Sequence, residues 1–533
     1  MSYTNNSCLI DKERFSMTDK MSVPKLNIDR RQFVGGLAGF TAAPAIITGV
    51  EARTRIADGI ASGDVTTNSA IIWGRSNKSA KMLVEWSTTP NFEKAQRVAG
   101  PVVTARSGYT GQIPLTGLPS GQEIFYRVRF GDSRGTETRI GHLRTPTKDH
   151  DVTFVFGGDQ CGAGWGINPD WGGLKLFETM RQTRPDFLIH LGDRIYADSP
   201  VLERASTPDG SSWKNIVTPA KSKVAETLEE FRGNYSYNFI DTHYRKFCED
   251  VPALTTWDDH EVVNDWWPDR KLSRRVMFRK GFIQSDVNTL VRNGRQAFFD
   301  FTPMQRHPTD PNRLFRKVSY GRNVDVFILD SRSYRSPNNR NRQENPGSET
   351  ALLGRYQINW LKAALAQSKA LWKIIANPLP IAHEKRKQRP RYDKFANSDN
   401  GAPLGREHEI TDILSHIKKH AITNTVWMSA DVHYSAAHHF HPDRAAFREF
   451  DPFWEFIAGP FHTRAGRIIN YDKTFGAERH FRTARAPRGN NPPSAGYVYF
   501  GHGRINAKTG ALTVGFRDIS GQSLYEKTIA AQR

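Results

Sequence analysis

Short apolar runs alternate with amphipathic stretches through the middle of the chain, and this alternation restricts the fold more than any other feature. The runs span 152–156, 186–191, 253–257, 324–329, 372–376 and 425–429. Continuous hydrophobicity of this length is typical of strands buried on both faces of a sheet. Helices are predicted between them at 173–183, 226–249, 285–301, 355–368 and 407–418. We therefore expect an α/β domain that binds ligands beyond the carboxyl ends of its strands.

The pattern changes on both sides of this region. From residue 55 to about 145, alternating segments such as 69–74, 82–87 and 125–130 are separated by turn-prone clusters, which predicts a small antiparallel β-sandwich. From Gly496 onward, alternating segments with glycine-containing turns are expected to add edge strands to the main sheets. We predict a signal region at 1–50, an N-terminal sandwich domain at 51–148 and a catalytic domain at 149–533. The segments 198–221 and 336–350 are interpreted as surface loops.

The N-terminus has the features of an export signal. Arg30 and Arg31 precede a weakly apolar run at 35–50, an arrangement that resembles a twin-arginine (Tat) signal. The run of about 16 residues is short for a membrane span. We expect a periplasmic or secreted protein, with cleavage between about residues 41 and 52. Of the three cysteines, Cys161 and Cys248 would remain, which is too few for a disulfide framework.

The chain is strongly basic, with a formal net charge of +20 and a pI near 9.8. Such a charge attracts polyanions, and the basic stretches 270–280 and 385–391 either steer anions or form solvated faces. No helix-turn-helix, zinc-finger spacing or RNP-type aromatic motif accompanies the charge. Specific recognition of nucleic acid is therefore not expected.

Nearly every predicted strand of the α/β domain ends in residues that can bind metal. These residues are Asp159, Cys161, Asp193, Tyr196, Asp258, Asp259, His260, Glu261, Asp330, Asn377, Asp431 and His433. One aspartate at a strand end usually serves a turn or a helix cap, but several carboxylates at one edge repel one another and need cations. Hard oxygen donors with imidazole, phenol and a candidate thiol suit iron, manganese, calcium or zinc.

Four motifs in order carry a family resemblance. They are Gly-Asp-x-x-Tyr-Ala-Asp at 192–198, Trp-Asp-Asp-His-Glu-x-x-Asn at 257–264, Leu-Asp-x-Arg-x-Tyr-Arg at 329–335 and Ser-Ala-Asp-Val-His at 429–433. The series resembles the PhoD-type alkaline phosphatases, which are related to calcineurin-like metallophosphoesterases and purple acid phosphatases. The segments 60–65 and 70–73 resemble the N-terminal sandwich of that family. The resemblance implies a four-layer αββα metallophosphoesterase core.

The resemblance also implies a centre of Fe(III) with Ca²⁺, for which Mn²⁺ or Zn²⁺ are alternatives. Carried over by position, Asp193 would bridge two ions, and Tyr196 and His433 would bind iron. Asp259 and Asp431 would bind the neighbouring divalent ion. The last iron ligand is either Asp159, which aligns with the end of the first strand, or Cys161, whose alternative is a buried spectator thiol.

The roles of the remaining polar residues stay open. His260 either protonates the leaving oxygen, orients phosphate, or supports a carboxylate. Arg194 and Asn264 are candidates for contacts with phosphate or with the ligands, and Asn377 is a candidate divalent ligand for which a turn role is favoured. For Arg332 we favour an ion pair with Asp330.

The predicted activity is hydrolysis of phosphate mono- or diesters by metal-activated hydroxide, attacking in line without a covalent enzyme intermediate. The alternative is a phospholipase D-like or envelope-polymer phosphodiesterase on the same scaffold. A rival of another class is an inactive polyanion-binding envelope protein. We expect small phosphate esters or phosphodiester polymers as ligands, no obligate protein partner, and a monomer.

Overall fold

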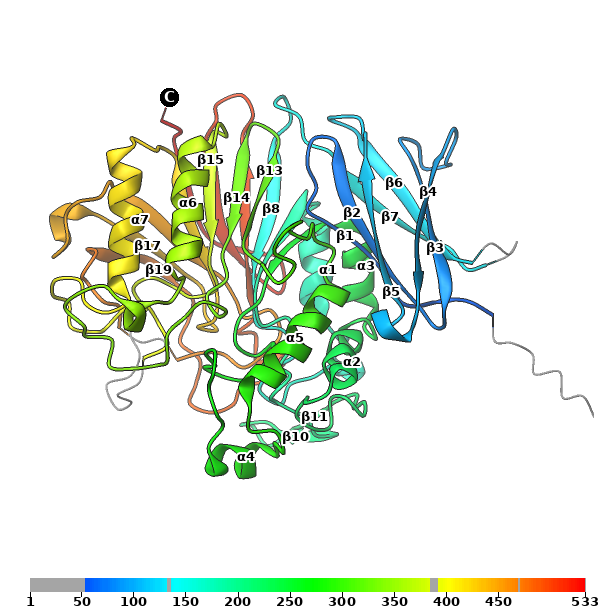
Figure 1. The fold of residues 1–533 in the computed structure, drawn as a ribbon, viewed down its shortest axis with the longest axis horizontal. Coiled ribbons are helices and arrows are strands. Elements are labelled where there is room, and N and C mark those ends of the chain that lie inside the picture. The colour runs from blue at the N-terminus through cyan, green and yellow to red at the C-terminus, as the bar shows by residue number, and fades with distance from the viewer. Residues whose placement is uncertain (1–52, 132–135, 384–391, 468–469, 533) are drawn as a thin grey trace, which may run out of the picture. The chain divides into compact units, whose positions relative to one another are not determined.

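A computed structural model describes residues 53–131, 136–383, 392–467 and 470–532 (Figure 1). The twin-arginine segment and the basic stretch at 385–391 lie outside these described residues. Within the described ranges, no helix combines the length and the hydrophobicity that crossing a bilayer requires.

Two large sheets form the centre of the described molecule. The nine-stranded sheet has the order β22 (Ser523–Ile529), β21 (Leu512–Asp518), β20 (Tyr499–Ile505), β8 (Val152–Gly157), β9 (Phe187–Leu191), β12 (Ala253–Thr256), β1 (Ile56–Gly63), β2 (Ser69–Ser76) and β5 (Thr110–Thr116). The seven-stranded sheet has the order β13 (Arg316–Tyr320), β14 (Val324–Ile328), β15 (Trp372–Ala376), β16 (Thr425–Ser429), β18 (Phe453–Ile457), β17 (Ala436–Phe440) and β19 (Ala477–Arg482).

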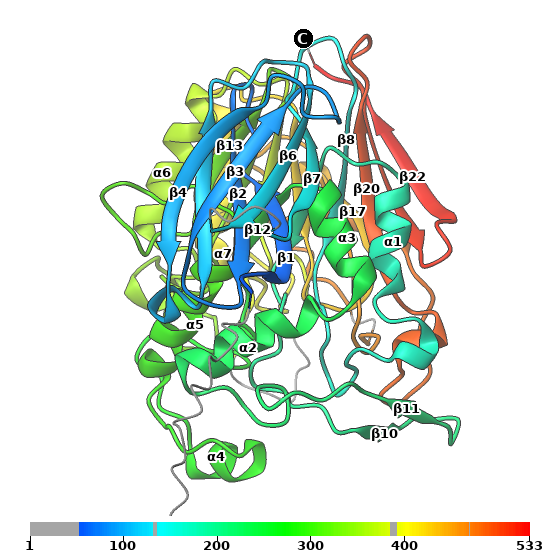
Figure 2. The same ribbon diagram turned by 90° about the vertical axis from the view of Figure 1, so that its right-hand side faces the viewer.

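The two sheets pack face to face and helices cover their outer faces. One apolar cluster joins Phe156 and Ile189 of the first sheet to Ile374 and Phe456 of the second. The helices α1 (Lys175–Gln182), α2 (Leu228–Asn238), α3 (Thr242–Asp250) and α5 (Val287–Phe301) contribute to a second cluster on the nine-stranded sheet, and Figure 2 shows α1 and α3 there. The helices α6 (Arg355–Gln367) and α7 (Glu407–Lys419) cover the other sheet. The predicted αββα arrangement is confirmed.

The six apolar runs all form strands, within one residue of the predicted bounds at each end. β8, β9 and β12 pair in parallel in one sheet, and β14, β15 and β16 pair in parallel in the other. Their carboxyl ends therefore share one side of the molecule. β20, β21 and β22 add to one edge of the nine-stranded sheet, as expected for the C-terminal segments.

The predicted helix at 226–249 is wrong in its continuity, because the structure has two helices, α2 and α3. The chain leaves the helical path between them, where the Asp241 carboxylate accepts a hydrogen bond from the Tyr244 amide at 2.9 Å. This side chain caps α3 and favours a new start over continuation. The segment 198–221 also contains a short hairpin, β10 (Arg204–Ser206) and β11 (Ser212–Lys214).

The N-terminal region contains the expected antiparallel sheet, with the order β4 (Gln96–Val103), β3 (Ala80–Ser87), β6 (Glu123–Phe130) and β7 (Arg139–Arg144). Its second layer, β1, β2 and β5, continues into the nine-stranded sheet where Gly63 pairs with Ala253. A Cβ on Gly63 would lie 2.1 Å from the carbonyl oxygen of Pro303, so only glycine fits this junction. The division into domains at residue 148 stays a prediction.

Candidate metal centre

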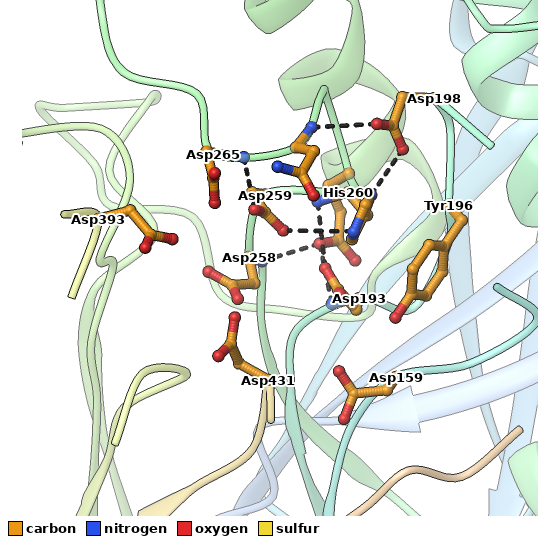
Figure 3. A network of polar contacts seen from close by, with 12 residues as sticks. Asp159, Asp193, Tyr196, Asp198, Asp258, Asp259, His260, Asp265, Asp393 and Asp431 are labelled. Atoms are coloured by element: carbon orange, nitrogen blue, oxygen red, sulfur yellow. Dashed lines mark hydrogen bonds and ion pairs between the residues drawn. The ribbon is translucent and has the colours of Figure 1, made fainter. Parts of the chain in front are cut away.

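Three groups of carboxylates and histidines lie beyond the strand ends, and Figure 3 labels all of their members except His433. They are Asp159–Asp193–His433, Asp193–Asp259–His260 and Asp259–Asp265–Asp393, each with ligand atoms within 4.8 Å of one another. Asp193 belongs to the first two groups and Asp259 to the last two. The sequence motifs therefore converge at one place, where Asp193 and Asp259 each lie between two neighbouring metal-competent groups.

The backbone at these positions is unusual. Asp159, Asp193, Asp431 and His433 have φ angles of 67°, 52°, 66° and 58°, in the left-handed region. Residues other than glycine adopt this conformation at a cost, and such residues concentrate at functional sites. Each of the four follows a buried parallel strand by a few residues. The strand ends turn sharply there and direct the side chains toward one another.

The donor set fits a bound cation. Asp159 is buried, and neither of its carboxylate oxygens has a hydrogen-bond partner among the described residues. Burial, followed by the nearby Asp258, raises the pKa of the Asp159 carboxyl well above its usual range. Burial likewise raises the pKa of Asp193. A positive ion placed between buried carboxylates stabilises their charged form and removes the cause of the raised pKa.

Tyr196 lies beside His433, the imidazole member of the first group. The Nδ1 atom of His433 lies 3.0 Å from the backbone carbonyl oxygen of Arg464, a contact that fixes the ring and directs Nε2 inward. Nε2 then lies 3.0 Å from the Tyr196 hydroxyl and 3.5 Å from Asp159 Oδ1. Burial lowers the pKa of His433 to about 3, so the ring is neutral, as a metal ligand must be.

His260 is held from two sides. Its ring stacks on Tyr196 with centroids 4.2 Å apart, and its Nδ1 lies 2.6 Å from Asp198 Oδ1. Burial alone would lower the pKa of His260, but Asp198, Asp259 and Asp193 raise it well above its usual value. Asp198 holds Nδ1, which leaves Nε2 as the ring nitrogen that can exchange a proton with a ligand. Asp198, the last residue of the Gly-Asp-x-x-Tyr-Ala-Asp motif, was given no role from sequence alone.

Glu261 ties two strand-end loops together. Its carboxylate accepts backbone hydrogen bonds from Asp193 at 3.0 Å, Arg194 at 2.6 Å and Asp258 at 2.8 Å. The side chain is fully buried, and burial raises its pKa to about 7. Glu261 thus positions Asp193 without joining any of the three groups. Glu261 was expected among the residues that can bind metal, and the structure gives it the role of positioning the backbone instead.

The expected ion pair between Arg332 and Asp330 is wrong. The guanidinium of Arg332 binds Asp258 at 2.5 Å and lies 3.6 Å from Asp259. Asp330 instead accepts hydrogen bonds from the backbone amides of Arg332 and Ser333, both at 3.0 Å. The aspartate therefore closes a turn, which leaves the arginine to neutralise the Asp258 carboxylate.

Asp431 and Cys161 lie outside the three groups. The Asp431 carboxylate forms a close ion pair with Lys394, and Figure 3 shows it directed toward Asp258 at the border of the cluster. Cys161 packs in the apolar cluster on the nine-stranded sheet, and burial raises its thiol pKa to about 12. Of the two candidates for the last iron ligand, the structure brings Asp159 into the cluster and Cys161 into the core.

Arg194, Asn264 and Asn377 were candidates for contacts with phosphate or with the metal ligands, and each has different partners in the structure. Arg194 directs its guanidinium away from the cluster, to the Tyr244 hydroxyl, the Thr302 hydroxyl and the Phe301 carbonyl oxygen. Asn264 is exposed and donates its backbone amide to Asp198 at 3.1 Å. Asn377 accepts from Ser331 and donates to the Leu379 carbonyl oxygen, as the favoured turn role requires.

Asp265 and Asp393 are members of the third group that sequence reasoning missed. Asp265 comes directly after the Trp-Asp-Asp-His-Glu-x-x-Asn motif, and its amide donates to Asp259 Oδ2 at 2.6 Å. Asp393 belongs to no motif. It comes from a loop far along the chain, so only the tertiary fold reveals it.

Comparisons with known proteins point to one family. A family model described as PhoD-like phosphatase matches residues 154–516, and the model of its N-terminal domain matches 41–147. Alkaline phosphatase D of Bacillus subtilis (strain 168) is 24% identical over 451 residues, covering 78% of this chain and 73% of the relative.

Two solved structures share the fold. The structure titled "Structure of PhoD" has a TM-score of 0.66 at 20% identity and covers 90% of both chains. The purple acid phosphatase PPD1 from yellow lupin (Lupinus luteus) seeds has a TM-score of 0.57 at 13% identity, covering 90% of this chain and 74% of that one.

Proposed function

The chain belongs to the PhoD-like phosphatase family, and from that premise we propose that it is an exported, metal-dependent phosphoesterase that hydrolyses phosphate mono- or diesters. The observation that carries the proposal is the position of Asp193, which belongs to two adjacent metal-competent groups. A shared carboxylate of this kind is what a two-cation phosphoesterase centre requires.

The proposed ligands follow from the contacts described above. Asp159, Asp193, Tyr196 and His433 would hold an Fe(III) ion, and Asp193 with Asp259 would hold Ca²⁺, with Asp431 beside them. The hard oxygen donors of the set suit both ions, and Mn²⁺ or Zn²⁺ are the alternatives. When bound, such cations supply Lewis acidity toward water and toward phosphoryl oxygens.

His260 is the proposed general acid. Asp198 holds its Nδ1 and Tyr196 supports its ring, so Nε2 faces the side on which Asp193 and Asp259 meet. A proton on Nε2 can pass to the leaving oxygen of the ester as the bond to phosphorus breaks. Lys280, 3.2 Å from Asp198 Oδ2, helps to keep that aspartate ionised.

The test uses protein purified with its native metals. We expect turnover of p-nitrophenyl phosphate, of bis-p-nitrophenyl phosphate, or of both, to disappear with a chelator and to return with iron and calcium. Turnover that survives complete removal of metal rejects the proposal. Metal analysis and a visible charge-transfer band, lost in Tyr196→Phe, test the iron assignment separately.

Export through the twin-arginine pathway is part of the proposal and rests on Arg30 and Arg31. Replacing both with lysine is expected to keep the enzyme in the cytoplasm, as measured by cell fractionation. Unchanged export would remove this part while leaving the hydrolase assignment intact.

A further inference from the structure

The helix α4 (Arg274–Lys280) exposes apolar side chains to an unusual degree. Phe278 on the helix is 94% exposed, and Ile283, just after it, is 84% exposed. These are the two most exposed large apolar side chains among the described residues. Apolar residues scattered singly on a surface are ordinary, but two such residues five positions apart in a basic segment call for a partner.

The same face of α4 is positively charged. Arg274, Arg275 and Arg279 are all exposed. Residues four apart share one side of a helix, which places Arg274 beside Phe278 and Arg275 beside Arg279. Like charges at this spacing destabilise an isolated helix, so the pattern does not serve the stability of α4 itself.

The segment is nevertheless firmly held. Leu272 and Phe282, which flank α4 on its two sides, are each only 5% exposed and belong to the apolar cluster on the nine-stranded sheet. The Ser273 hydroxyl caps the first turn by accepting from the Val276 amide, and Gly281 ends the helix with a left-handed φ of 85°. The outward direction of Phe278 is therefore a built feature of the fold.

Both ribbon views place α4 beyond the carboxyl ends of the parallel strands, on the lower side of the molecule (Figures 1 and 2). Lys280 at the end of α4 donates to the carbonyl oxygen of Asp198 at 3.1 Å and to its Oδ2 at 3.2 Å. Asp198 in turn holds His260. α4 thus borders the candidate metal centre.

We propose that α4 is an interfacial anchor that docks the protein on an anionic lipid bilayer. The three arginines match the charge of anionic headgroups, and Phe278 and Ile283 match the apolar layer directly beneath them. A soluble polyanion would satisfy the arginines but would offer nothing apolar to the other two side chains. The bilayer is therefore the occupant that accounts for both kinds of residue.

The test measures sedimentation of the full-length, metal-loaded chain with vesicles. Vesicles of phosphatidylglycerol mixed with phosphatidylcholine are expected to bind the protein, and pure phosphatidylcholine vesicles are not. The double variant Phe278→Ser/Ile283→Ser should weaken partitioning more than about tenfold. The triple variant Arg274→Gln/Arg275→Gln/Arg279→Gln should weaken it about a hundredfold. Turnover of a soluble ester should stay unchanged in both.

Matched controls separate α4 from general hydrophobicity and charge. Val102→Ser removes a 63% exposed side chain from β4. Arg322→Gln/Lys369→Gln/Lys419→Gln removes three exposed charges near the amino ends of β14, β15 and β16. Both controls should partition within about twofold of wild type, apart from the weak effect of net charge. Equal losses in the controls and in the α4 variants would overturn the proposal.

A local probe excludes binding through other parts of the chain. A polarity-sensitive fluorophore on Phe278→Cys, in a Cys8→Ser background, should shift to the blue with anionic vesicles because the position enters an apolar medium. No shift overturns the proposal. So does full binding by Phe278→Ser/Ile283→Ser together with loss in the arginine variant, a result that would indicate a soluble polyanion as the ligand.

Discussion

Two buried aspartates at opposite ends of the β8–β9 pair have contrasting surroundings. Asp186, just before β9, accepts a hydrogen bond from the Thr153 amide at 2.8 Å and lies 3.7 Å from Arg144. Asp159, just after β8, has no hydrogen-bond partner for either oxygen among the described residues. Burial raises the pKa of both carboxyls. Hydrogen-bond and ion-pair partners, rather than burial, therefore distinguish a structural carboxylate from a candidate cation ligand.

The backbone follows the same division. Asp159 occupies the left-handed region at a φ of 67°, and Asp193 at the end of the neighbouring strand does so at 52°. Strain and unpaired charge thus coincide at the carboxyl ends of the strands, where a bound cation would offset both. Left-handed non-glycine residues also occur elsewhere, for example at Arg184 near Asp186, so the functional end is marked by strain together with an unpaired carboxylate.

The largest expected effect comes from Asp193→Asn. Loss of the shared carboxylate should lower turnover of p-nitrophenyl phosphate by about a thousandfold or more, since cation stabilisation is worth several kcal/mol. Metal content, measured by elemental analysis, should fall with it. Asp186→Asn is the matched control and should keep near wild-type turnover. Equal activity of the two variants would contradict the distinction between the two ends of the strands.

Asp159→Asn should change stability in opposite directions with and without metal. In chelated protein the substitution removes a buried, repelled charge and should raise Tm. In metal-loaded protein it removes a ligand, and a hundredfold weaker affinity would lower stability by about 2.7 kcal/mol. Thermal unfolding with and without chelator measures both. Asp186→Asn should shift Tm equally in the two conditions, and a sign reversal there would contradict the interpretation.

The sequence predicted what depends on short-range pattern. The six parallel strands were found because each is a continuous apolar run, and Asp193, Tyr196 and His433 because they follow such runs within compact motifs. The PhoD-type resemblance added the expected pairing of iron with calcium, which composition and spacing alone left open.

What the sequence missed depends on distant contacts. Asp393 joins the third group from a separate loop. Arg332 binds Asp258, 74 residues away in the sequence, rather than the nearby Asp330. The break between α2 and α3 depends on the cap that Asp241 provides, and its carboxylate also binds the distant Leu174 amide. Long-range partners of this kind leave no periodic signal in one sequence.

Glu261 combines features of Asp159 and Asp186. It lies at the carboxyl ends of the strands, like Asp159, but its carboxylate has hydrogen-bond partners, like that of Asp186. Glu261→Gln keeps the shape but loses acceptor capacity toward three backbone amides. We expect a loss of about 2 kcal/mol in the free energy of unfolding, of similar size with and without metal. Denaturant titration of both forms measures it. A loss confined to metal-loaded protein would place Glu261 among the ligands instead.

The smallest effect concerns the pH dependence set by Asp186. Burial raises its pKa in the folded protein from 3.8 to about 6. The contribution of Asp186 to the free energy of unfolding is therefore fully present below about pH 4. It is lost as the pH rises through 6, by up to about 3 kcal/mol. Asparagine stays neutral, so Asp186→Asn should be more stable than wild type at pH 7.5. The raised pKa already includes the attraction to Arg144, and poorer hydrogen bonding by the amide reduces the gain to about 1 kcal/mol.

Unfolding at pH 4.5 and pH 7.5 tests this expectation, because the difference between Asp186→Asn and wild type should grow with pH. Turnover at pH 7.5 should not change, since Asp186 lies at the amino end of β9, away from the metal-competent groups. A stability difference that shrinks as the pH rises would show that Arg144 dominates the site. In that case Asp186 would stabilise the fold through its ion pair with Arg144. Burial would then no longer be the main influence on the pKa of both aspartates.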